Sequence, residues 1–195
     1  MDNNELGFSI LDFWAWNGSD LLNNTLRGAL AEFIVAKALG IQINTAREDW
    51  TEYDLTYPYE GCAIPIEVKS SAYLQAWPQN KPSNINFNIA PSRAWANQRY
   101  AEPYERHAAI YIFCLYTLRD MSKKSAVNVL RLDQWLFMVL ETERINMALA
   151  LQRSVSYASL LSLSPICCPY SRIKDSVSEV LVRSKGSPRK LQPPG

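Results

Sequence analysis

The chain has little of what several protein classes require. His107 is the only histidine, and the four cysteines show no paired CxxC spacing, which disfavours a zinc site and a secreted disulfide framework. No run approaches about 18 consecutive apolar residues, and the N-terminus lacks a basic segment followed by an apolar one. We therefore expect a cytoplasmic protein that makes no membrane contact and keeps its thiols reduced and buried.

The chain also has almost no excess of charge of either sign, because it contains 20 Lys and Arg residues and 19 Asp and Glu residues. A protein that binds polyanions through a bulk positive field would be strongly basic, so any nucleic-acid role must depend on local charge. The sequence also lacks the GxSxG, P-loop and Rossmann fingerprints. Serine hydrolases, nucleoside triphosphatases and dinucleotide-dependent oxidoreductases are therefore without support.

The composition that is present indicates one folded domain. A hydrophobic content of 48% over 195 residues is enough for a single core. The composition changes only near the C-terminus, where residues 184–195 combine three prolines and basic residues with no acid. We predict one domain over residues 1–183 and a disordered basic tail over residues 184–195.

Hydrophobic spacing predicts a helix over residues 20–39 that ends at Gly40. Short strands are predicted over 41–46, 53–58 and 64–71, with a tight turn at Gly61 between the last two. Further strands are predicted over 85–90, 107–118 and 134–142, and further helices over 143–151, 156–163 and 171–183. This order predicts an α/β (α+β) fold in which helices flank a mixed β-sheet.

The segment from residue 53 to residue 71 carries the chemically informative pattern. If Glu60 and Gly61 form the turn, three pairs of residues lie opposite each other: Tyr57 and Ile64, Leu55 and Ile66, and Asp54 and Glu67. The apolar side chains then share one face of the hairpin, and the two carboxylates share the other face with Lys69.

Two carboxylates directly across an antiparallel pair repel each other unless a cation lies between them. Mg²⁺ is a natural candidate, because it binds one or two carboxylates and keeps several waters. Lys69 is close enough on the same face to reach an oxyanion or an attacking water. On the predicted helix, Glu32 has small and apolar neighbours at helical spacing, so its face can approach the sheet and bring Glu32 to the same site.

Plainer interpretations stay open for these residues. Glu67 and Lys69 would then be an exposed ion pair on a strand, worth about 0–1 kcal/mol. Asp54 would cap a turn at the start of its strand. Each residue alone favours the plainer interpretation, whereas the combination with Glu32 favours a metal site.

Asp54, a twelve-residue gap and then Glu67-Val68-Lys69 on an apolar strand, after a helix bearing Glu32, resembles the PD-(D/E)xK nuclease superfamily. Tyr53 stands where the name of the motif has proline. The resemblance implies a restriction-endonuclease-like core and Mg²⁺-dependent (or Mn²⁺-dependent) hydrolysis of phosphodiester bonds, in DNA rather than RNA. A homodimer is implied by the same analogy, because two sites cut two strands.

The resemblance also implies a role for each residue. Asp54, Glu67 and the Val68 carbonyl would bind the metal, and Glu32 would be an accessory ligand of the metal or of a water. Lys69 would orient or deprotonate the attacking water and stabilise the pentacovalent phosphate. The metal would act as a Lewis acid and activate water.

The main basic concentration outside the tail contains Lys81, Arg93, Arg99 and Arg106. These residues are candidate phosphate contacts, with an ordinary solvated surface as the alternative. Two other functions stay open. The chain would be either a nuclease-fold protein that binds nucleic acid or a protein partner without cutting, or an interaction module whose exposed aromatic residues are functional.

Overall fold

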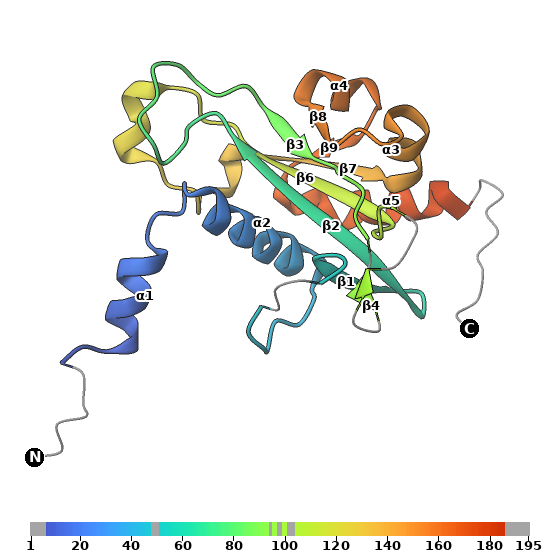
Figure 1. Ribbon diagram of the computed structural model, residues 1–195, viewed down its shortest axis with the longest axis horizontal. Helices are drawn as coiled ribbons and strands as arrows, with labels where there is room; N and C mark the ends of the chain where they lie inside the picture. The colour runs from blue at the N-terminus through green and yellow to red at the C-terminus, as the bar shows by residue number, and fades with distance from the viewer. Residues whose placement is uncertain (1–6, 48–50, 94, 97–98, 101–103, 186–195) are drawn as a thin grey trace, which may run out of the picture.

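The computed structural model describes residues 7–47, 51–93, 95–96, 99–100 and 104–185. Its centre is a five-stranded mixed sheet of order β1-β2-β6-β7-β9 (Figure 1). The strands are β1 (Leu55–Tyr59), β2 (Cys62–Ala72), β6 (Ile110–Tyr116), β7 (Trp135–Glu141) and β9 (Ile166–Cys168). Only β2 and β6 run parallel, and the other neighbours are antiparallel.

Helices cover both faces of this sheet, which confirms the expected mixed α/β fold (Figure 1). On one face, α2 (Asn24–Leu39) and α5 (Ile173–Lys185) enclose the first core cluster. On the other face, the second core cluster is covered by α3 (Thr142–Leu149), α4 (Tyr157–Ser162) and the short pair β3 (Asn86–Asn88) and β8 (Ser154–Ser156).

Strand β6 is the central strand, and all seven of its residues are buried. Successive side chains of a strand point to opposite faces, so Ile112 packs in the first cluster while Tyr111 and Phe113 pack in the second. The continuous apolar run predicted for a buried strand is thereby confirmed. The same alternation in β2 puts Ile66 and Val68 on the side of α2.

Helix α2 is fixed at both ends by its own sequence. The Asn23 side chain caps it by accepting hydrogen bonds from the Thr25 and Leu26 amides at 2.9 and 3.5 Å, so the helix begins at residue 24 rather than 20. Gly40 ends it in the left-handed conformation with φ of 73°. The helix predicted over residues 20–39 is therefore confirmed with a later start.

The hairpin of β1 and β2 also follows the sequence. Glu60 and Gly61 have φ values of 48° and 78°, as the two central residues of a type I′ turn require. The resulting register sets Tyr57 against Ile64 and Leu55 against Ile66, as predicted. The turn therefore decides which side chains of β2 meet the segment before β1.

One predicted strand is wrong. Residues 41–46 form a loop, in which Ile43 is exposed. Alternating apolar residues form a strand only beside a partner, and β1 is the edge of the sheet. The expected three-stranded meander is therefore a two-stranded hairpin.

Several elements were not expected from the sequence: α1 (Ile10–Gly18), β4 (Trp95–Ala96), β5 (Arg99–Tyr100), β8, β9 and the 3-10 turns η1 (Met121–Ala126), η2 (Leu132–Gln134) and η3 (Tyr170–Arg172). Helix α5 continues through Lys185, two residues into the predicted tail. The rest of that tail, residues 186–195, lies outside the described residues.

The four thiols are free but differ in exposure. Cys114 and Cys168 are buried as expected, whereas Cys62 and Cys167 are exposed, so the prediction was wrong for these two. No helix in the described part of the chain has the length and apolar character needed to cross a membrane.

Candidate active site

Asp54 is held at the edge of the sheet by two hydrogen bonds to β2. Its amide donates to the Ile66 carbonyl at 3.1 Å, which continues the hairpin ladder beyond β1. Its carboxylate Oδ2 then accepts a hydrogen bond from the Val68 amide at 2.7 Å. The Asp54 side chain thus accepts the hydrogen bond that a backbone carbonyl of a longer β1 would accept from Val68. This bond fixes Asp54 beside the Glu67–Val68 peptide.

The Val68 carbonyl points to the same edge. Within a strand, the amide and carbonyl of one residue face the same neighbour, and the Val68 amide faces Asp54. Strand β1 begins at Leu55, so it has no residue opposite Val68. The carbonyl oxygen therefore faces the same open edge beside Asp54, while the Val68 side chain is buried in the first core cluster.

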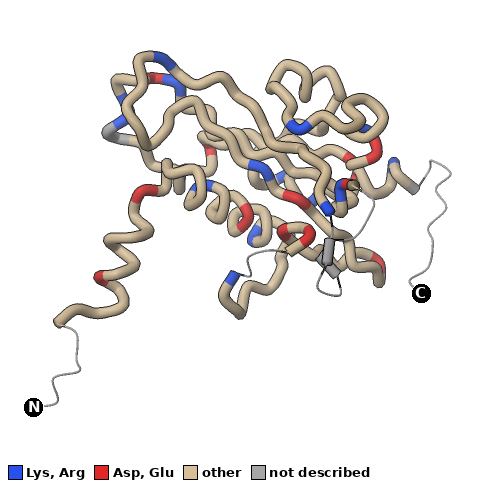
Figure 2. The backbone as a smooth tube through the Cα atoms, in the orientation of Figure 1, with Lys and Arg blue, Asp and Glu red and all other residues tan. Residues whose placement is uncertain are grey.

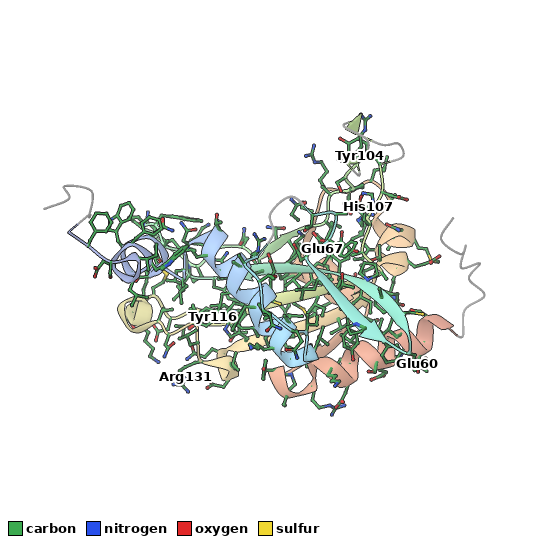
Figure 3. All side chains as sticks on the ribbon, turned by 90° about the horizontal axis from the view of Figure 1, so that it is seen from below. Glu60, Glu67, Tyr104, His107, Tyr116 and Arg131 are labelled. Carbon is green, nitrogen blue, oxygen red and sulfur yellow. The ribbon has the colours of Figure 1, made fainter. Side chains whose placement is uncertain are left out.

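Glu67 and Lys69 project from β2 toward the second core cluster, and their side chains form an ion pair. The side chains are 16% and 28% exposed, respectively, so the pair lies in a partly buried site rather than on a freely solvated strand face. In the parallel pairing with β6, Glu67 lies beside Tyr111 and Lys69 beside Phe113. Figure 3 shows Glu67 near the centre of the sheet, on the side of the molecule where His107 and Tyr104 also lie.

The pKa of Asp54 depends on burial and on the charges around it. Burial raises the pKa of Asp54, and the nearby charge of Glu67 raises it further. Lys69, the Val68 amide and Arg47 act in the opposite direction and lower the same pKa. A second cation beside Asp54 and Glu67 would relieve this repulsion.

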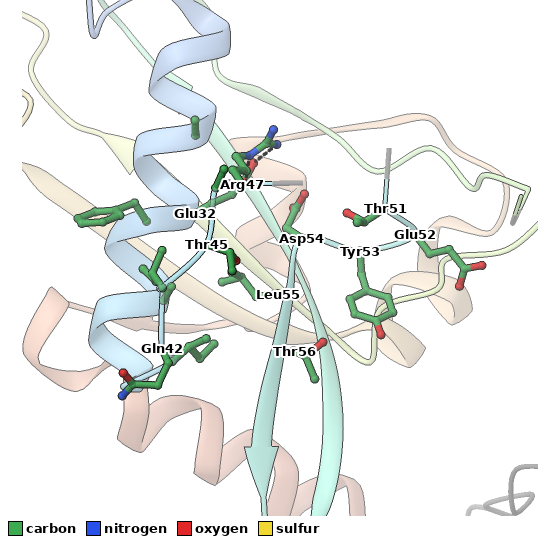
Figure 4. Close-up of a pocket in the computed structure, with 16 residues that line it drawn as sticks. Glu32, Gln42, Thr45, Arg47, Thr51, Glu52, Tyr53, Asp54, Leu55 and Thr56 are labelled. Carbon is green, nitrogen blue, oxygen red and sulfur yellow. Dashed lines mark hydrogen bonds and ion pairs between the residues drawn. The ribbon is translucent and has the colours of Figure 1, made fainter. Parts of the chain in front are cut away.

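Glu32 occupies a different side of the site. Arg47 holds its carboxylate through two contacts, Nε to Oε2 at 2.6 Å and Nη2 to Oε1 at 2.9 Å. Both residues line a cavity of about 770 Å³ between α2 and the segment before β1, and Asp54 lies on its wall (Figure 4). Glu67 faces the other side of the sheet, so Asp54 is the residue that connects the two sides.

The structure therefore brings together Asp54, Glu67, Val68 and Lys69, and it leaves Glu32 outside this group. Within the described residues, no group of three or more His, Cys, Asp or Glu side chains is placed to hold a metal ion. The oxygen donors along this edge of β2 are the carboxylates of Asp54 and Glu67 and one backbone carbonyl. These are hard donors in a partly buried site, which fits Mg²⁺ with waters completing its coordination.

Two residues of the site were missed in the sequence. Tyr111 lies beside Glu67 and is 4% exposed. Burial raises its pKa, and the charges of Glu67 and Asp54 add to that effect. Arg47 lies directly after the segment 41–46 that was predicted as a strand, and its pairing with Glu32 had no signal in the sequence. Tyr111 meets Glu67 only through the pairing of β2 with β6, which no local pattern predicts.

The structure places the four residues predicted to contact phosphate in different environments. Arg106 is buried and structural, because its guanidinium donates to the Ile89, Ala150 and Gln152 carbonyls and to the Asn146 side chain at 2.6–2.9 Å. These four acceptors satisfy the hydrogen-bonding needs of a buried guanidinium. The interpretation of Arg106 as part of a phosphate-contact surface was therefore wrong.

The other three basic residues stay candidates. Lys81 is exposed in the loop between β2 and β3. Arg93 is exposed with its guanidinium 4.9 Å from the ring centre of Tyr104. Arg99 contributes its backbone to β5, and its side chain lies outside the described residues. Neither Lys81 nor Arg93 is among the groups that act on the pKa of Asp54.

The family model described as bacteriophage T4 endonuclease IV matches residues 11–152. The chain belongs to this family. The matched segment is well over half of the chain and contains Glu32, Asp54, Glu67, Val68 and Lys69. It ends before β8, α4, β9 and α5.

Among solved structures, a bacterial homing endonuclease, I-Ssp6803I, is similar at 17% sequence identity and a TM-score of 0.38. The similarity covers 68% of this chain and 76% of that chain. No curated protein matches the sequence.

Proposed function

We propose that this member of the endonuclease family is a Mg²⁺-dependent nuclease that hydrolyses phosphodiester bonds of DNA. The observation that carries the proposal is the convergence of Asp54 on the Glu67-Val68-Lys69 segment of β2, in the arrangement that resembles the PD-(D/E)xK nucleases. Family membership supports a nuclease acting on nucleic acid. The metal and the preference for DNA rest on the resemblance.

In this proposal, Asp54, Glu67 and the Val68 carbonyl hold the metal at the sheet edge. When bound, the metal supplies Lewis acidity and activates water. The hydrogen bond from the Val68 amide fixes the Asp54 carboxylate in advance of binding, so little side-chain ordering remains to oppose coordination.

Lys69 acts on the phosphate in the proposed reaction. Its ion pair with Glu67 keeps the ammonium group on the same face as the carboxylates. From there it donates hydrogen bonds to the attacking water or to a nonbridging phosphate oxygen, and it offsets the negative charge that develops in the transition state. Water forms the new bond to phosphorus, and the bond from phosphorus to one ester oxygen breaks.

Glu32 has an indirect role in this mechanism. It holds Arg47 through a two-contact ion pair, and Arg47 lowers the pKa of Asp54. Glu32 is therefore a positioning residue, which favours the ionised Asp54 that a metal needs. This role replaces direct ligation in our proposal.

The test is cleavage of supercoiled plasmid, single-stranded DNA and RNA by the purified chain, with Mg²⁺ and with a chelator. We expect Mg²⁺-dependent cleavage of DNA that falls by at least about 100-fold in Asp54→Asn and in Lys69→Met, or roughly 2.7 kcal/mol in the barrier. Glu32→Gln should lose less, because it acts through Arg47.

Matched controls are Asp133→Asn and Lys174→Met, which remove an exposed carboxylate and an exposed ammonium group away from the site. Both controls should cleave like the unaltered protein. Equal cleavage by Asp54→Asn and Lys69→Met would reject the proposed site. Binding of nucleic acid without any cleavage would instead favour the non-cutting nuclease fold.

A further inference from the structure

Helix α1 is an apolar helix that contacts little of its own chain. None of its nine residues is buried, and it projects away from the sheet (Figure 1). The large apolar side chains on it and just before it are exposed: Phe8 59%, Ile10 63%, Leu11 73%, Phe13 38%, Trp14 55% and Trp16 82%. A helix that is apolar around its circumference normally lies in a protein interior.

The sequence nevertheless specifies this helix. Ser9 and Asp12 form a capping box, with the Asp12 amide donating to Ser9 Oγ at 3.2 Å and the Ser9 amide donating to Asp12 Oδ2 at 2.7 Å. Isolated helices shorter than about 12–15 residues are marginal in water even with good caps. Helix α1 therefore needs a packing surface.

No described segment of the same chain supplies that surface, since none of the residues of α1 is buried. The connection to α2 is ordered by hydrogen bonds from the Leu21 amide to the Ser19 carbonyl at 3.1 Å and from the Asn23 amide to the Asp20 carbonyl at 3.0 Å. Leu21 and Leu22 pack on the first core cluster. The connection leads α1 away from the sheet (Figure 1).

The exposed apolar area is of the size of an interface. The six side chains expose roughly 700 Å² if each offers about 200 Å² in full. The largest apolar patch of a typical monomer is about 300–600 Å², whereas a stable interface takes about 800 Å² from each partner. Phe8 and helix α1 together thus supply most of one side of a protein interface.

Charge decides what kind of partner fits. The first 26 residues contain four acidic residues and no Lys or Arg, so the remaining chain carries all 20 basic residues against 15 acidic ones. An acidic apolar segment is repelled by nucleic acid, and helices that lie on membranes are rich in Lys and Arg. A second copy of this chain offers both its net positive remainder, three of whose basic residues lie in the predicted tail, and an identical apolar helix that carries no Lys or Arg (Figure 2).

We propose that α1 is a dimerisation arm that packs reciprocally on a second copy of this chain. A two-fold arrangement puts the α1 of each copy against the α1 of the other, with the partner's body on the remaining side. This arrangement encloses a helix that is apolar all round. It requires neither the metal site nor nuclease activity.

The test is the mass of the full-length chain by sedimentation equilibrium across the micromolar range, without metal or nucleic acid. We expect a mass near twice 22.2 kDa, reduced to a single chain in Trp14→Ser/Trp16→Ser and in Leu11→Lys. Trp77→Ser is the matched control, because Trp77 is 49% exposed on the body, and it should stay dimeric. Circular dichroism of every variant should show the same folded body.

Three results would overturn the proposal: a monomeric unaltered chain across that range, a dimer that persists in both α1 variants, or a dimer that Trp77→Ser also abolishes. Binding of the unaltered chain to anionic vesicles or to single-stranded DNA that is lost in the α1 variants would also overturn it. In that case α1 would contact a membrane or nucleic acid instead.

Discussion

Asp54 combines a fixed position with an unfavourable electrostatic environment. Its carboxylate is held by the Val68 amide, yet burial and the charge of Glu67 raise its pKa above that of an ordinary aspartate. An ionised carboxylate that is buried near a second carboxylate lowers the free energy of unfolding, and functional sites commonly carry such a cost. This conflict has a measurable pH dependence.

We predict that Asp54→Asn stabilises the metal-free protein at neutral pH. A carboxyl with a raised pKa contributes its full stability below the unfolded pKa and loses it as the pH rises through the folded pKa. The free energy of unfolding of Asp54→Asn should therefore exceed that of the unaltered protein only slightly near pH 4. The difference should grow toward pH 7, to about 1 kcal/mol or roughly 2–4 °C in Tm. Thermal unfolding in a chelator across this range measures it, and a gain that does not change with pH would contradict the explanation.

Tyr111 is the second residue whose environment indicates a role. It is 4% exposed and lies beside Glu67 in the pairing of β2 and β6. A tyrosine hydroxyl is protonated at neutral pH, and burial together with the charge of Glu67 raises the pKa of Tyr111 further. The hydroxyl is therefore a donor in the neighbourhood of Glu67.

We expect Tyr111→Phe to lower kcat for DNA cleavage by about tenfold, or about 1.4 kcal/mol in the barrier, with little change in KM or Tm. Tyr157→Phe is the control, since Tyr157 lies at the start of α4 and away from Glu67. A Tyr111→Phe protein with normal kcat would mean that the ring only fills the second core cluster.

At the scale of elements, the β1–β2 hairpin is what brings the site together. Its two turn residues both have positive φ, and the ladder carries Asp54 to the Glu67–Val68 peptide. A Cβ added at Gly61 would meet open space, so the cost of a side chain there is conformational. Gly28 in α2 also faces open space but is in helical backbone.

The two glycines should therefore respond to alanine with opposite signs. Gly61→Ala should destabilise the chain by about 1–2 kcal/mol, because an L-residue is disfavoured at positive φ. Gly28→Ala should stabilise it by about 0.5–1 kcal/mol through helix propensity. Urea unfolding measures both changes. Changes of the same sign would contradict the turn assignment.

The same elements show what the sequence predicts and what it does not. The hairpin and its facing residues were predictable, because a local turn sets the register. The loop over residues 41–46 was not, because Ile41 and Ile43 alternate like a strand but pair with no strand in the described part of the chain, and Ile41 packs on the first core cluster instead. Tyr111 meets Glu67 only through the parallel pairing of β2 and β6, and about 40 residues separate these strands in the sequence, beyond the reach of any local pattern.

At the scale of the whole molecule, metal binding should couple to global stability. A ligand that binds only the folded state stabilises it by about 1.4 kcal/mol at ten times its Kd. We therefore expect Mg²⁺ or Mn²⁺ to raise Tm of the unaltered chain and of Asp133→Asn, and to leave Tm of Asp54→Asn and Glu67→Gln unchanged. Equal shifts in all four proteins would indicate metal binding elsewhere.

The central claim is that Asp54, Glu67 and the Val68 carbonyl form a divalent metal site at the edge of β2. The most direct measurement is the anomalous difference density of crystals of the full chain grown with Mn²⁺, beside crystals of Asp54→Asn grown in the same way. The expected result is a peak within coordinating distance of the Asp54 and Glu67 carboxylates in the unaltered protein and no peak in the variant. A peak only at other residues, or carboxylates that point away from each other, would contradict the claim.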